Sequence, residues 1–280
     1  MKVAVTGATG FIGRHVLAEL ERGSVETISL VRPSTVKPLG HYGSRVAQLD
    51  LNSASPNAFE LMGCPDVLIH LAWSGLPNYK SLHHFEQELP AQYRFLKHLI
   101  ESGLQTLVVA GTCFEYGMQS GSLSENIAMH PSNPYGFAKD VLRVQLEYLK
   151  AVHSFQLTWA RLFYLYGEGQ PESSLLPQLS RAAERGDQVF NMSGGEQLRD
   201  YLPVAEAAKY LVLLALAEKD IGSVNVCSGS PISVRKLVEG WIKENGWSIT
   251  PSFGHYPYPD YEPMAFWGDR KKLDSLLERK

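Results

Sequence analysis

Short apolar runs alternate with longer amphipathic stretches from residue 2 to about residue 162, and no other feature constrains the fold as strongly. The apolar runs have the composition of buried strands, in the order KVAV, TISLV, RVAQLD, DVLIHLA, TLVVAG and FQLTWARL. Between them, FIGRHVLAELERG, AQYRFLKHLIESG and PYGFAKDVLRVQLEYLKAVH space apolar residues three or four apart, as amphipathic helices do. This order predicts an α/β fold, a doubly wound parallel sheet with helices on both faces.

Three glycines stand where the first predicted strand meets the first predicted helix, in VTGATGFIGRH. Gly7, Gly10 and Gly13 allow a tight turn and a close approach of the backbone to a pyrophosphate, which then lies at the positive end of the helix. Because the glycines occupy this strand–turn–helix position, the first half of the chain is predicted to be a Rossmann-type dinucleotide-binding fold.

Positive charge near the second strand indicates which dinucleotide binds. Arg32 stands where a dinucleotide fold often has an acidic residue for the adenosine ribose, and Arg14 follows the third glycine. These cations favour NADP(H), whose 2′-phosphate they could hold, over NAD(H), which remains possible. The alternative is that Arg14 and Arg32 are solvated surface residues that contact no cofactor. Asp50 and Leu51 follow the third strand and are expected at the adenine.

The rhythm changes after residue 163, where YGEGQPESSLLPQ is followed by a helix and later by loops and aromatic residues such as YPYPDYEP. We expect these late segments to form a smaller C-terminal substrate-binding cap, while a strand near SVNVCS returns to the main sheet. The dinucleotide-binding domain is therefore predicted to comprise residues 1–162 and about 203–229. The cap is predicted to comprise about 163–202 and 230–280.

Charge and cysteine content narrow the partners. The net charge of −3 comes from 26 basic and 29 acidic residues mixed along the chain, which predicts neither nucleic-acid nor membrane binding. Three cysteines without C-x-x-C spacing predict neither a disulfide framework nor a metal site. The N-terminus lacks a signal-peptide apolar region, so we expect a soluble cytoplasmic protein with a small-molecule substrate.

The segment SNPYGFAKD carries the strongest chemical signal. Pro134 suits the first turn of a helix capped by Ser132 or Asn133, and Tyr135 and Lys139 then share one helical face. A protonated lysine near a phenol lowers the pKa of the phenol, which makes tyrosine usable as an acid or base. Tyrosine and lysine at this spacing also occur on ordinary helices.

Further motifs follow in order along nearly the whole chain. HLAW stands for a usual H-L-A-A, GTCFEYG for a Ser/Thr-x-x-x-Tyr-Gly segment, RLFYLYGEGQ for R-x-x-N-x-Y-G-P-x-Q, and GGEQLRDYLPVAEAA for G-x-G-x-Q-x-R-D-Y-x-x-V-x-D-x-A. With the glycine turn and Y-x-x-x-K, they resemble the extended short-chain dehydrogenase/reductase family, also known as the NAD-dependent epimerase/dehydratase family. The resemblance is to its nucleotide-sugar branch.

The resemblance implies specific roles. Thr112 would hydrogen-bond the substrate oxygen, Tyr135 would exchange the proton, and Lys139 would steady Tyr135 and the nicotinamide ribose. The predicted cofactor contacts are Gly7, Thr9, Gly10, Phe11, Ile12, Gly13, Arg14, Arg32, Asp50, Leu51, Leu71, Ala72, Trp73, Tyr135 and Lys139. The predicted substrate contacts are Thr112, Cys113, Phe114, Tyr135, Phe163, Tyr164, Leu175, Asn191 and Arg199.

Some positions depart from the family pattern or have a second interpretation. Arg199 would pair with the substrate diphosphate, or form only a surface ion pair. Tyr164 replaces a common asparagine that contacts substrate, and Glu88 replaces the usual asparagine of the helix before the fifth strand. Cys113 is more typical of a small buried residue than of a reagent. The same resemblance predicts a homodimer, paired through helices near residues 86–102 and 133–153.

The residues after Thr112 limit the reaction. A 4,6-dehydratase of this family would carry Asp-Glu there, whereas this chain has Cys113 and Phe114. The enzymes that make GDP-fucose place a cysteine where Phe114 stands. The remaining groups suit NADP(H)-dependent reduction of the 4-keto group of a dTDP-, GDP- or CDP-linked 4-keto-6-deoxyhexose. A nucleotide-sugar 4-epimerase with retained NAD, or a non-catalytic NADP-sensing protein, are the alternatives.

Overall fold

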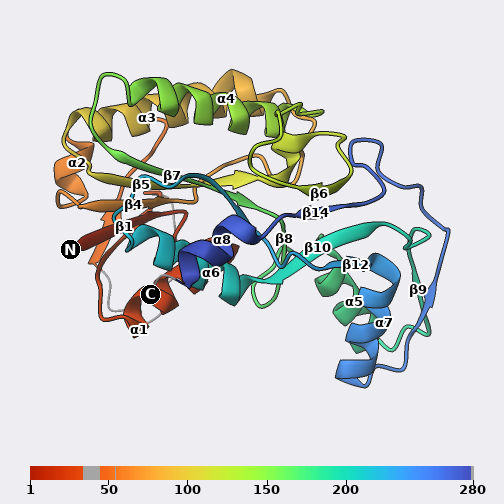
Figure 1. The fold of residues 1–280 in the computed structure, drawn as a ribbon. Helices are drawn as coiled ribbons and strands as arrows, with labels where there is room; N and C mark the ends of the chain where they lie inside the picture. The colour runs from red at the N-terminus through yellow and green to blue at the C-terminus, as the bar shows by residue number, and fades with distance from the viewer. Residues whose placement is uncertain (34–44, 54, 279–280) are drawn as a thin grey trace.

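A seven-stranded parallel sheet forms the centre of the protein in the computed structural model, which describes residues 1–33, 45–53 and 55–278 (Figure 1). Its strands are β1 (Lys2–Thr6), β2 (Glu26–Val31), β3 (Arg45–Gln48), β4 (Val67–His70), β5 (Thr106–Thr112), β7 (Gln156–Leu162) and β11 (Gly222–Val226). They lie in the order β11-β7-β5-β4-β1-β2-β3, and every neighbouring pair is parallel. The predicted sheet is confirmed, including the returning strand near SVNVCS.

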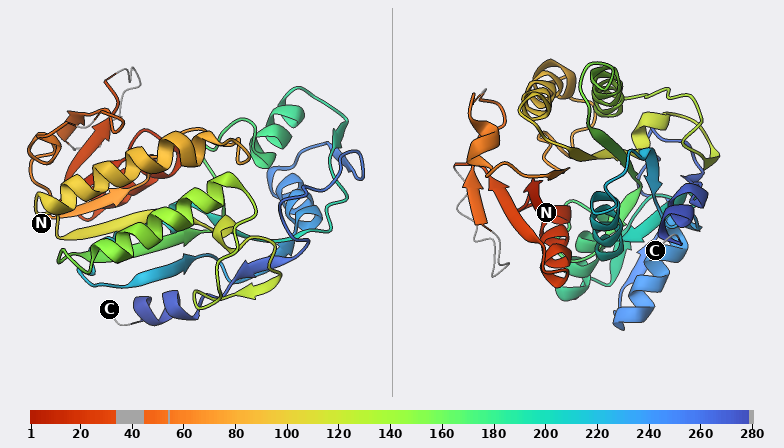
Figure 2. Two further views of the ribbon diagram at one scale, coloured as in Figure 1. Left: turned by 90° about the horizontal axis from the view of Figure 1, so that it is seen from above. Right: turned by 60° about the vertical axis from the view of Figure 1, so that its left-hand side comes forward.

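Helices cover both faces of this sheet. One face carries α2 (Ala58–Leu61), α3 (Leu89–Glu101) and α4 (Pro134–Leu149), and the other carries α1 (Phe11–Arg22), α6 (Val204–Ala215) and α8 (Lys271–Leu277). Figure 2 shows α3 and α4 side by side over their face. Each face has its own apolar core because the strand side chains alternate between the two layers. The doubly wound α/β fold is therefore confirmed.

The sequence around α4 explains where this helix begins. Asn133 has an extended backbone, and its side chain accepts a hydrogen bond of 2.9 Å from the Gly136 N–H, so it caps the helix as one of the two predicted residues. Pro134 occupies the first turn, where its fixed φ fits and no N–H is needed. The helix ends at Leu149, four residues before the end of the predicted stretch, and turns follow.

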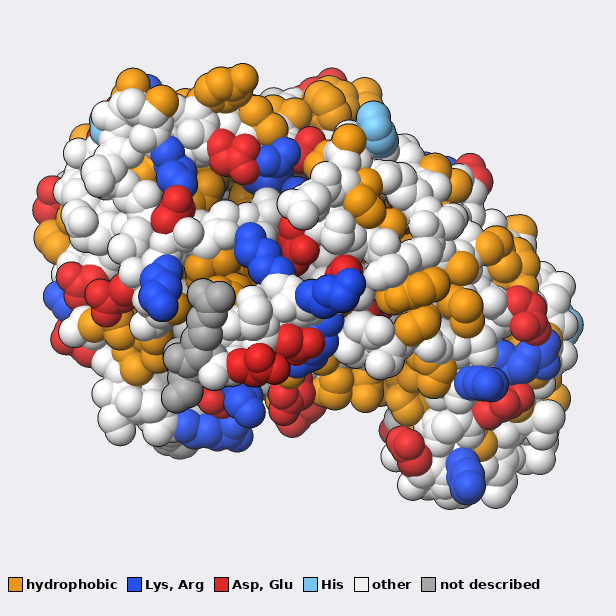
Figure 3. Space-filling view, in the orientation of Figure 1, with side chains coloured by type: hydrophobic (Ala, Val, Ile, Leu, Met, Phe, Trp, Pro, Cys, Tyr) orange, Lys and Arg blue, Asp and Glu red, His pale blue; other side chains and the backbone are white. Residues whose placement is uncertain are grey.

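The later part of the chain forms a second group of elements beside the sheet. It contains α5 (Leu175–Glu184), α7 (Val234–Asn245), β8 (Tyr164–Tyr166), β9 (Val189–Asn191), β10 (Leu198–Pro203), β12 (Pro231–Ser233) and β13 (Thr250–Ser252). Its core includes Leu179, Met192, Val238 and Trp241. In Figure 3 a notch separates the part that carries α5 and α7 from the main body, and both signs of charge are interspersed over this face. The predicted domain boundaries stay a prediction.

Two short strands complete the fold, β6 (Gly121–Leu123) and β14 (Phe266–Gly268), which pair in parallel. Over residues 1–33, 45–53 and 55–278, no helix combines the length and the apolar character needed to cross a membrane. The strand order reverses direction between β1 and β4, and in doubly wound sheets a ligand binds in the crevice outside the carboxyl ends at such a point. Thr6, His70 and Thr112 are the last residues of β1, β4 and β5, and therefore mark the edge where a site is expected.

Candidate active site

The glycine turn after β1 leaves room for a ligand only if its glycines are kept. Gly7 has a φ of +67°, and a Cβ there would lie 2.9 Å from the Ala72 nitrogen. A Cβ on Gly13 would lie 2.1 Å from the Gly7 oxygen, so α1 approaches the turn too closely for any side chain. Gly10 precedes the first residue of α1 and has no side chain that could cap the helix. The first N–H groups of α1 can therefore donate hydrogen bonds to a bound anion. This cradle fits the pyrophosphate of a dinucleotide.

The ends of β1 and β4 are joined beneath this turn. The Thr6 hydroxyl lies 2.9 Å from Nδ1 of His70 and accepts hydrogen bonds from the Leu71 and Ala72 N–H groups, at 3.1 and 3.3 Å. Burial lowers the pKa of His70 to about 3, so its ring is neutral near pH 7. Leu71 and Ala72, two of the predicted cofactor contacts, are therefore held at the switch point.

The predicted contacts farther from the turn lie on several elements. Thr9 precedes α1, whose first turn contains the half-buried Phe11 and Ile12. Arg32 is exposed just after β2, whereas Arg14 lies against Gly169, where an added Cβ would be 2.7 Å from Nη1 of the arginine. The side chain of Asp50 accepts the Asn52 N–H at 3.0 Å.

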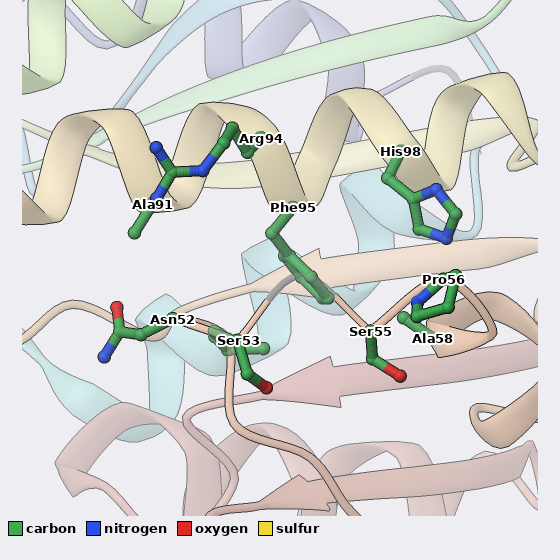
Figure 4. Close-up of a pocket in the computed structure, with 10 residues that line it drawn as sticks. Asn52, Ser53, Ser55, Pro56, Ala58, Ala91, Arg94, Phe95 and His98 are labelled. Carbon is green, nitrogen blue, oxygen red and sulfur yellow. The ribbon is translucent and has the colours of Figure 1, made fainter.

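Leu51 lines a cavity of about 250 Å³ between α3 and the segment after β3 (Figure 4). Polar and aromatic side chains of α3 form its other wall, namely Arg94, Phe95 and His98. The cavity begins where the adenine end of the cofactor is expected.

The three predicted catalytic residues come together at the carboxyl end of β5. Thr112 is its last residue, Tyr135 lies in the first turn of α4, and Lys139 follows one turn later. The Thr112 side chain lies near enough to Tyr135 to lower the pKa of its phenol slightly, although burial outweighs this effect. Lys139 Nζ donates to the Ala110 carbonyl at 2.8 Å and lies 6.0 Å from the centre of the Tyr135 ring. All three side chains are buried.

Burial dominates the protonation of this group. It raises the pKa of the Tyr135 phenol, with smaller contributions in the same direction from Tyr79 and Glu115. It lowers the pKa of Lys139 to about 7, against the opposing effect of Glu115 and Glu88. The net direction for Tyr135 is thus opposite to the predicted one, because desolvation outweighs any stabilisation of the phenolate.

The remainder of GTCFEYG is held by a buried ion pair. Glu115 accepts hydrogen bonds from the Thr112 N–H at 2.8 Å, from Trp159 Nε1 at 2.9 Å and from Arg161 Nε at 2.6 Å. The Thr112 side chain in turn accepts from the Phe114 N–H at 3.3 Å, so Thr112 and Glu115 form a capping box. Glu115 therefore has a structural role, and it positions Thr112.

Aromatic rings form a wall beside Tyr135. The Tyr79 ring lies 4.8 Å from Phe114, 5.6 Å from Tyr135 and 6.1 Å from Tyr261, measured between ring centres. Burial raises the pKa of Tyr79 to about 12. Neither Tyr79 nor Tyr261 was expected from the sequence, because both lie in loops without periodicity. Burial also raises the pKa of the Cys113 thiol, which is consistent with a buried structural residue.

Arg199 is buried and already paired. Its Nε and Nη2 lie 3.0 and 2.8 Å from one oxygen of Glu262, which also accepts the Tyr164 hydroxyl at 2.6 Å. The Arg199 side chain is only 2% exposed, so its ion pair is not the surface pair considered from the sequence. Glu262 was missed, although an acidic residue beside the proline and tyrosines of YPYPDYEP was the available signal.

The other predicted substrate residues are spread over the second group of elements. Phe163 is buried between Tyr116 and Phe266, with ring centres 6.3 Å apart in both cases. Leu175 packs on the α5–α7 core, and Asn191 is exposed at the end of β9. Their contact with a substrate stays a prediction.

Glu88 fastens the loop after β4. It accepts hydrogen bonds from the Ser74 N–H at 3.0 Å and from Gln92 Nε2 at 2.7 Å, and the Ser74 hydroxyl donates to its second oxygen. Burial would raise the pKa of Glu88, but the hydrogen bonds from Ser74 and Gln92 outweigh it and the pKa is lower than usual. The replacement of the family's asparagine thus gives a charged anchor for residues 74–88.

A strand, a glycine turn and a helix at the switch point of a doubly wound sheet, next to a buried tyrosine and lysine, define a dinucleotide-dependent oxidoreductase. The model of the "NAD dependent epimerase/dehydratase family" matches residues 3–227, and the chain belongs to this family. The predicted family is therefore confirmed.

Individual relatives cover almost the whole chain. The "dTDP-6-deoxy-L-talose 4-dehydrogenase (NAD(+))" of Aggregatibacter actinomycetemcomitans is 29% identical, over 96% of this chain and 99% of that protein. An "uncharacterized UDP-glucose epimerase YtcB" of Bacillus subtilis (strain 168) is 26% identical, over 99% and 92%. The solved structure of MoeE5 in complex with UDP-glucuronic acid and NAD is 28% identical, with a TM-score of 0.83 over 99% of this chain and 92% of that one.

Proposed function

We propose that this protein is an NADP(H)-dependent reductase of the 4-keto group of a nucleotide-linked 4-keto-6-deoxyhexose, with a dTDP, GDP or CDP carrier. The observation that carries the proposal is the buried group of Thr112, at the carboxyl end of β5, and Tyr135 and Lys139, one turn apart at the start of α4. The 4-dehydrogenase of A. actinomycetemcomitans is named for the reverse of such a reduction, which supports this reaction class.

The protonated Tyr135 phenol suits the proton-donating step of the proposed reduction. Because burial raises the pKa of its phenol, the side chain is protonated at neutral pH and is a proton donor. In this reaction the Thr112 hydroxyl binds the substrate oxygen, Tyr135 gives it a proton, and the Lys139 ammonium stabilises the phenolate that results. A bound nicotinamide supplies the hydride.

The neighbours of Thr112 support a reaction without further acid–base steps. Cys113 is a buried thiol with a raised pKa, and Phe114 carries no titratable group. A dehydration across a neighbouring carbon needs an additional acid and base, and this segment does not provide them at the two positions after Thr112.

We further propose that Arg199 contacts the substrate diphosphate and that Arg32 favours NADP(H). Arg32 is exposed just beyond β2, where the adenosine ribose lies in this fold. NAD(H) use is the alternative, supported by NAD in the name of the A. actinomycetemcomitans relative and in the MoeE5 complex. We also propose a homodimer formed through α3 and α4, a cytoplasmic location, and a substrate-binding role for the elements around α5 and α7.

A 4-epimerase with retained NAD is the second candidate. It uses the same three side chains, and it is favoured by the YtcB relative, which covers nearly all of this chain. A non-catalytic NADP-sensing protein is the third, and the retained Tyr135 and Lys139 argue against it.

Turnover assays separate these candidates. The purified protein should oxidise NADPH when a freshly made nucleotide-linked 4-keto-6-deoxyhexose is added. The loss of absorbance of the reduced nicotinamide measures this oxidation. Tyr135→Phe should lower the rate by roughly 10²- to 10⁴-fold. Tyr148→Phe is the matched control on the same helix, since Tyr148 is 76% exposed. Interconversion of nucleotide hexoses without net NADPH consumption, with NAD retained on purification, would instead establish the epimerase.

A further inference from the structure

Trp73 stands where the H-L-A-A motif would have a second alanine, and its indole faces the Lys139 ammonium. Lys139 Nζ lies 3.9 Å from the centre of the Trp73 ring, well within the range of a cation–π contact. The Trp73 ring also meets the Tyr135 ring edge-on at 6.0 Å. One bulky side chain therefore contacts both the lysine and the tyrosine of the proposed catalytic group.

A chain of hydrogen bonds fixes the orientation of this indole. Trp73 Nε1 donates to Nδ1 of His84 at 3.1 Å, and Nε2 of His84 lies 2.8 Å from the Asn78 carbonyl. The indole has only a donor, so His84 accepts on Nδ1 and donates from Nε2, which is the neutral tautomer. Burial lowers the pKa of His84, so this tautomer persists at neutral pH.

The remaining surroundings of Lys139 leave its charge poorly stabilised. Its one hydrogen bond among the described residues goes to the Ala110 carbonyl, at 2.8 Å. Five titratable groups face it: Tyr135 of α4, Glu115 after β5, His84 and Glu88 of the short π-helix before α3, and His70 of β4. Burial outweighs the two carboxylates and lowers the pKa of Lys139 to about 7. An additional contact that stabilises the ammonium therefore raises the charged fraction of Lys139 at pH values near 7.

We propose that Trp73 is a positioning residue that acts through Lys139, its indole face holding the ammonium charged beside Tyr135, with His84 holding the ring in place. A desolvated cation over an indole is stabilised more than over any other aromatic ring. Because the ammonium must be charged to stabilise the Tyr135 phenolate, Trp73 sets the pH above which reduction fails. This inference rests on the proposed reaction.

The first test compares pH profiles of kcat for NADPH-dependent reduction. In Trp73→Leu, the leucine side chain still excludes water but offers no aromatic face to the ammonium. The alkaline limb of the kcat profile should therefore move to lower pH by roughly one unit. Trp73→Phe should restore part of this shift, because a benzene face binds a cation less strongly. Tyr148→Phe is the control, since Tyr148 is an exposed aromatic residue away from Lys139. An alkaline limb that stays in place or moves to higher pH in Trp73→Leu would overturn the proposal.

The second test needs no substrate, so it separates this inference from the proposed function. The difference in intrinsic fluorescence between the wild-type protein and Trp73→Phe reports the emission of Trp73. This difference should change with pH near neutrality, as Lys139 loses its proton. Lys139→Met should abolish this titration and leave the difference signal flat. A titration that persists in Lys139→Met, or a wild-type difference signal flat between pH 6 and pH 10, would refute the contact whatever the enzyme's reaction is.

Discussion

Removal of the Glu115 carboxylate should both destabilise the protein and displace Thr112. Glu115 is completely buried, Arg161 is 2% exposed, and their closest atoms are 2.6 Å apart. In Glu115→Ala, the Arg161 guanidinium loses its carboxylate partner and keeps a weak 3.5 Å contact with the Tyr116 hydroxyl and a position 5.1 Å from the centre of the Tyr116 ring. Breaking a buried ion pair in this way costs about 3–5 kcal/mol. In a chain of this size that corresponds to a fall in Tm of roughly 5–9 °C.

Thermal unfolding followed by circular dichroism measures this loss, together with chemical denaturation at fixed pH. Glu172→Ala is the control, because Glu172 also pairs with an arginine but its side chain is 84% exposed, and we expect no measurable change in Tm. Glu115→Gln keeps an oxygen for the Thr112 N–H and so should retain more activity than Glu115→Ala at comparable stability.

A double replacement separates the energy of the pair from the penalty of leaving one charge alone. Glu115→Leu with Arg161→Met removes both charges and should be more stable than Glu115→Ala, because no uncompensated charge stays buried. If Glu115→Ala loses less than about 1 kcal/mol, or if the double variant is the less stable of the two, the interpretation of this pair is incorrect.

Three further changes test the electrostatics of the site. Lys139→Met should abolish turnover yet stabilise the protein by about 1–2 kcal/mol at pH 7. Because the pKa of Lys139 in the folded protein is lowered to about 7, this gain in stability should shrink as the pH rises from 7 towards 10.5. A difference in Tm that does not change with pH would contradict this prediction. Glu262→Gln should remove the carboxylate that pairs with Arg199, so a nucleoside diphosphate should bind roughly tenfold more tightly, the equivalent of about 1.4 kcal/mol. Calorimetry measures this affinity, and weaker binding would show that Glu262 orients Arg199 for the ligand. Arg32→Glu should raise KM for NADPH at least about tenfold while leaving KM for NADH nearly unchanged, and equal effects on both would exclude a contact with the 2′-phosphate.

The parts of the fold and site that the sequence predicts are those encoded by local patterns. Strand and helix periodicity gives the main sheet, because its strands are buried on both faces and read as continuous apolar runs. The glycine turn is predictable because a Cβ at Gly13 would overlap the backbone of the turn. Tyr135 and Lys139 are predictable because their spacing places them on one face of a helix start, whereas Thr112 is predictable only through the family's Ser/Thr-x-x-x-Tyr-Gly motif.

The contacts that sequence reasoning missed join segments far apart in the chain. Glu262 meets Arg199 across 63 residues, and Tyr164 across 98. Tyr79 and Tyr261 lie in loops whose course depends on the whole fold, so neither periodicity nor a motif places them beside Phe114. The error about the pKa of Tyr135 has a similar origin, because desolvation depends on all surrounding elements and not on the spacing of two residues.

The opposite pKa shifts of Tyr135 and Lys139 have a joint consequence for the proposed proton transfer. Both shifts favour the neutral forms, a phenol and an amine, so the site without substrate resists separating charge. Reduction begins from the protonated phenol and creates a phenolate only as the proton leaves, whereas oxidation of an alcohol must begin from that phenolate. Near neutral pH the phenol is therefore ready to give up a proton, and the phenolate that remains needs the Lys139 ammonium beside it. In the proposed reduction, the Trp73 indole keeps that ammonium charged against the burial around it.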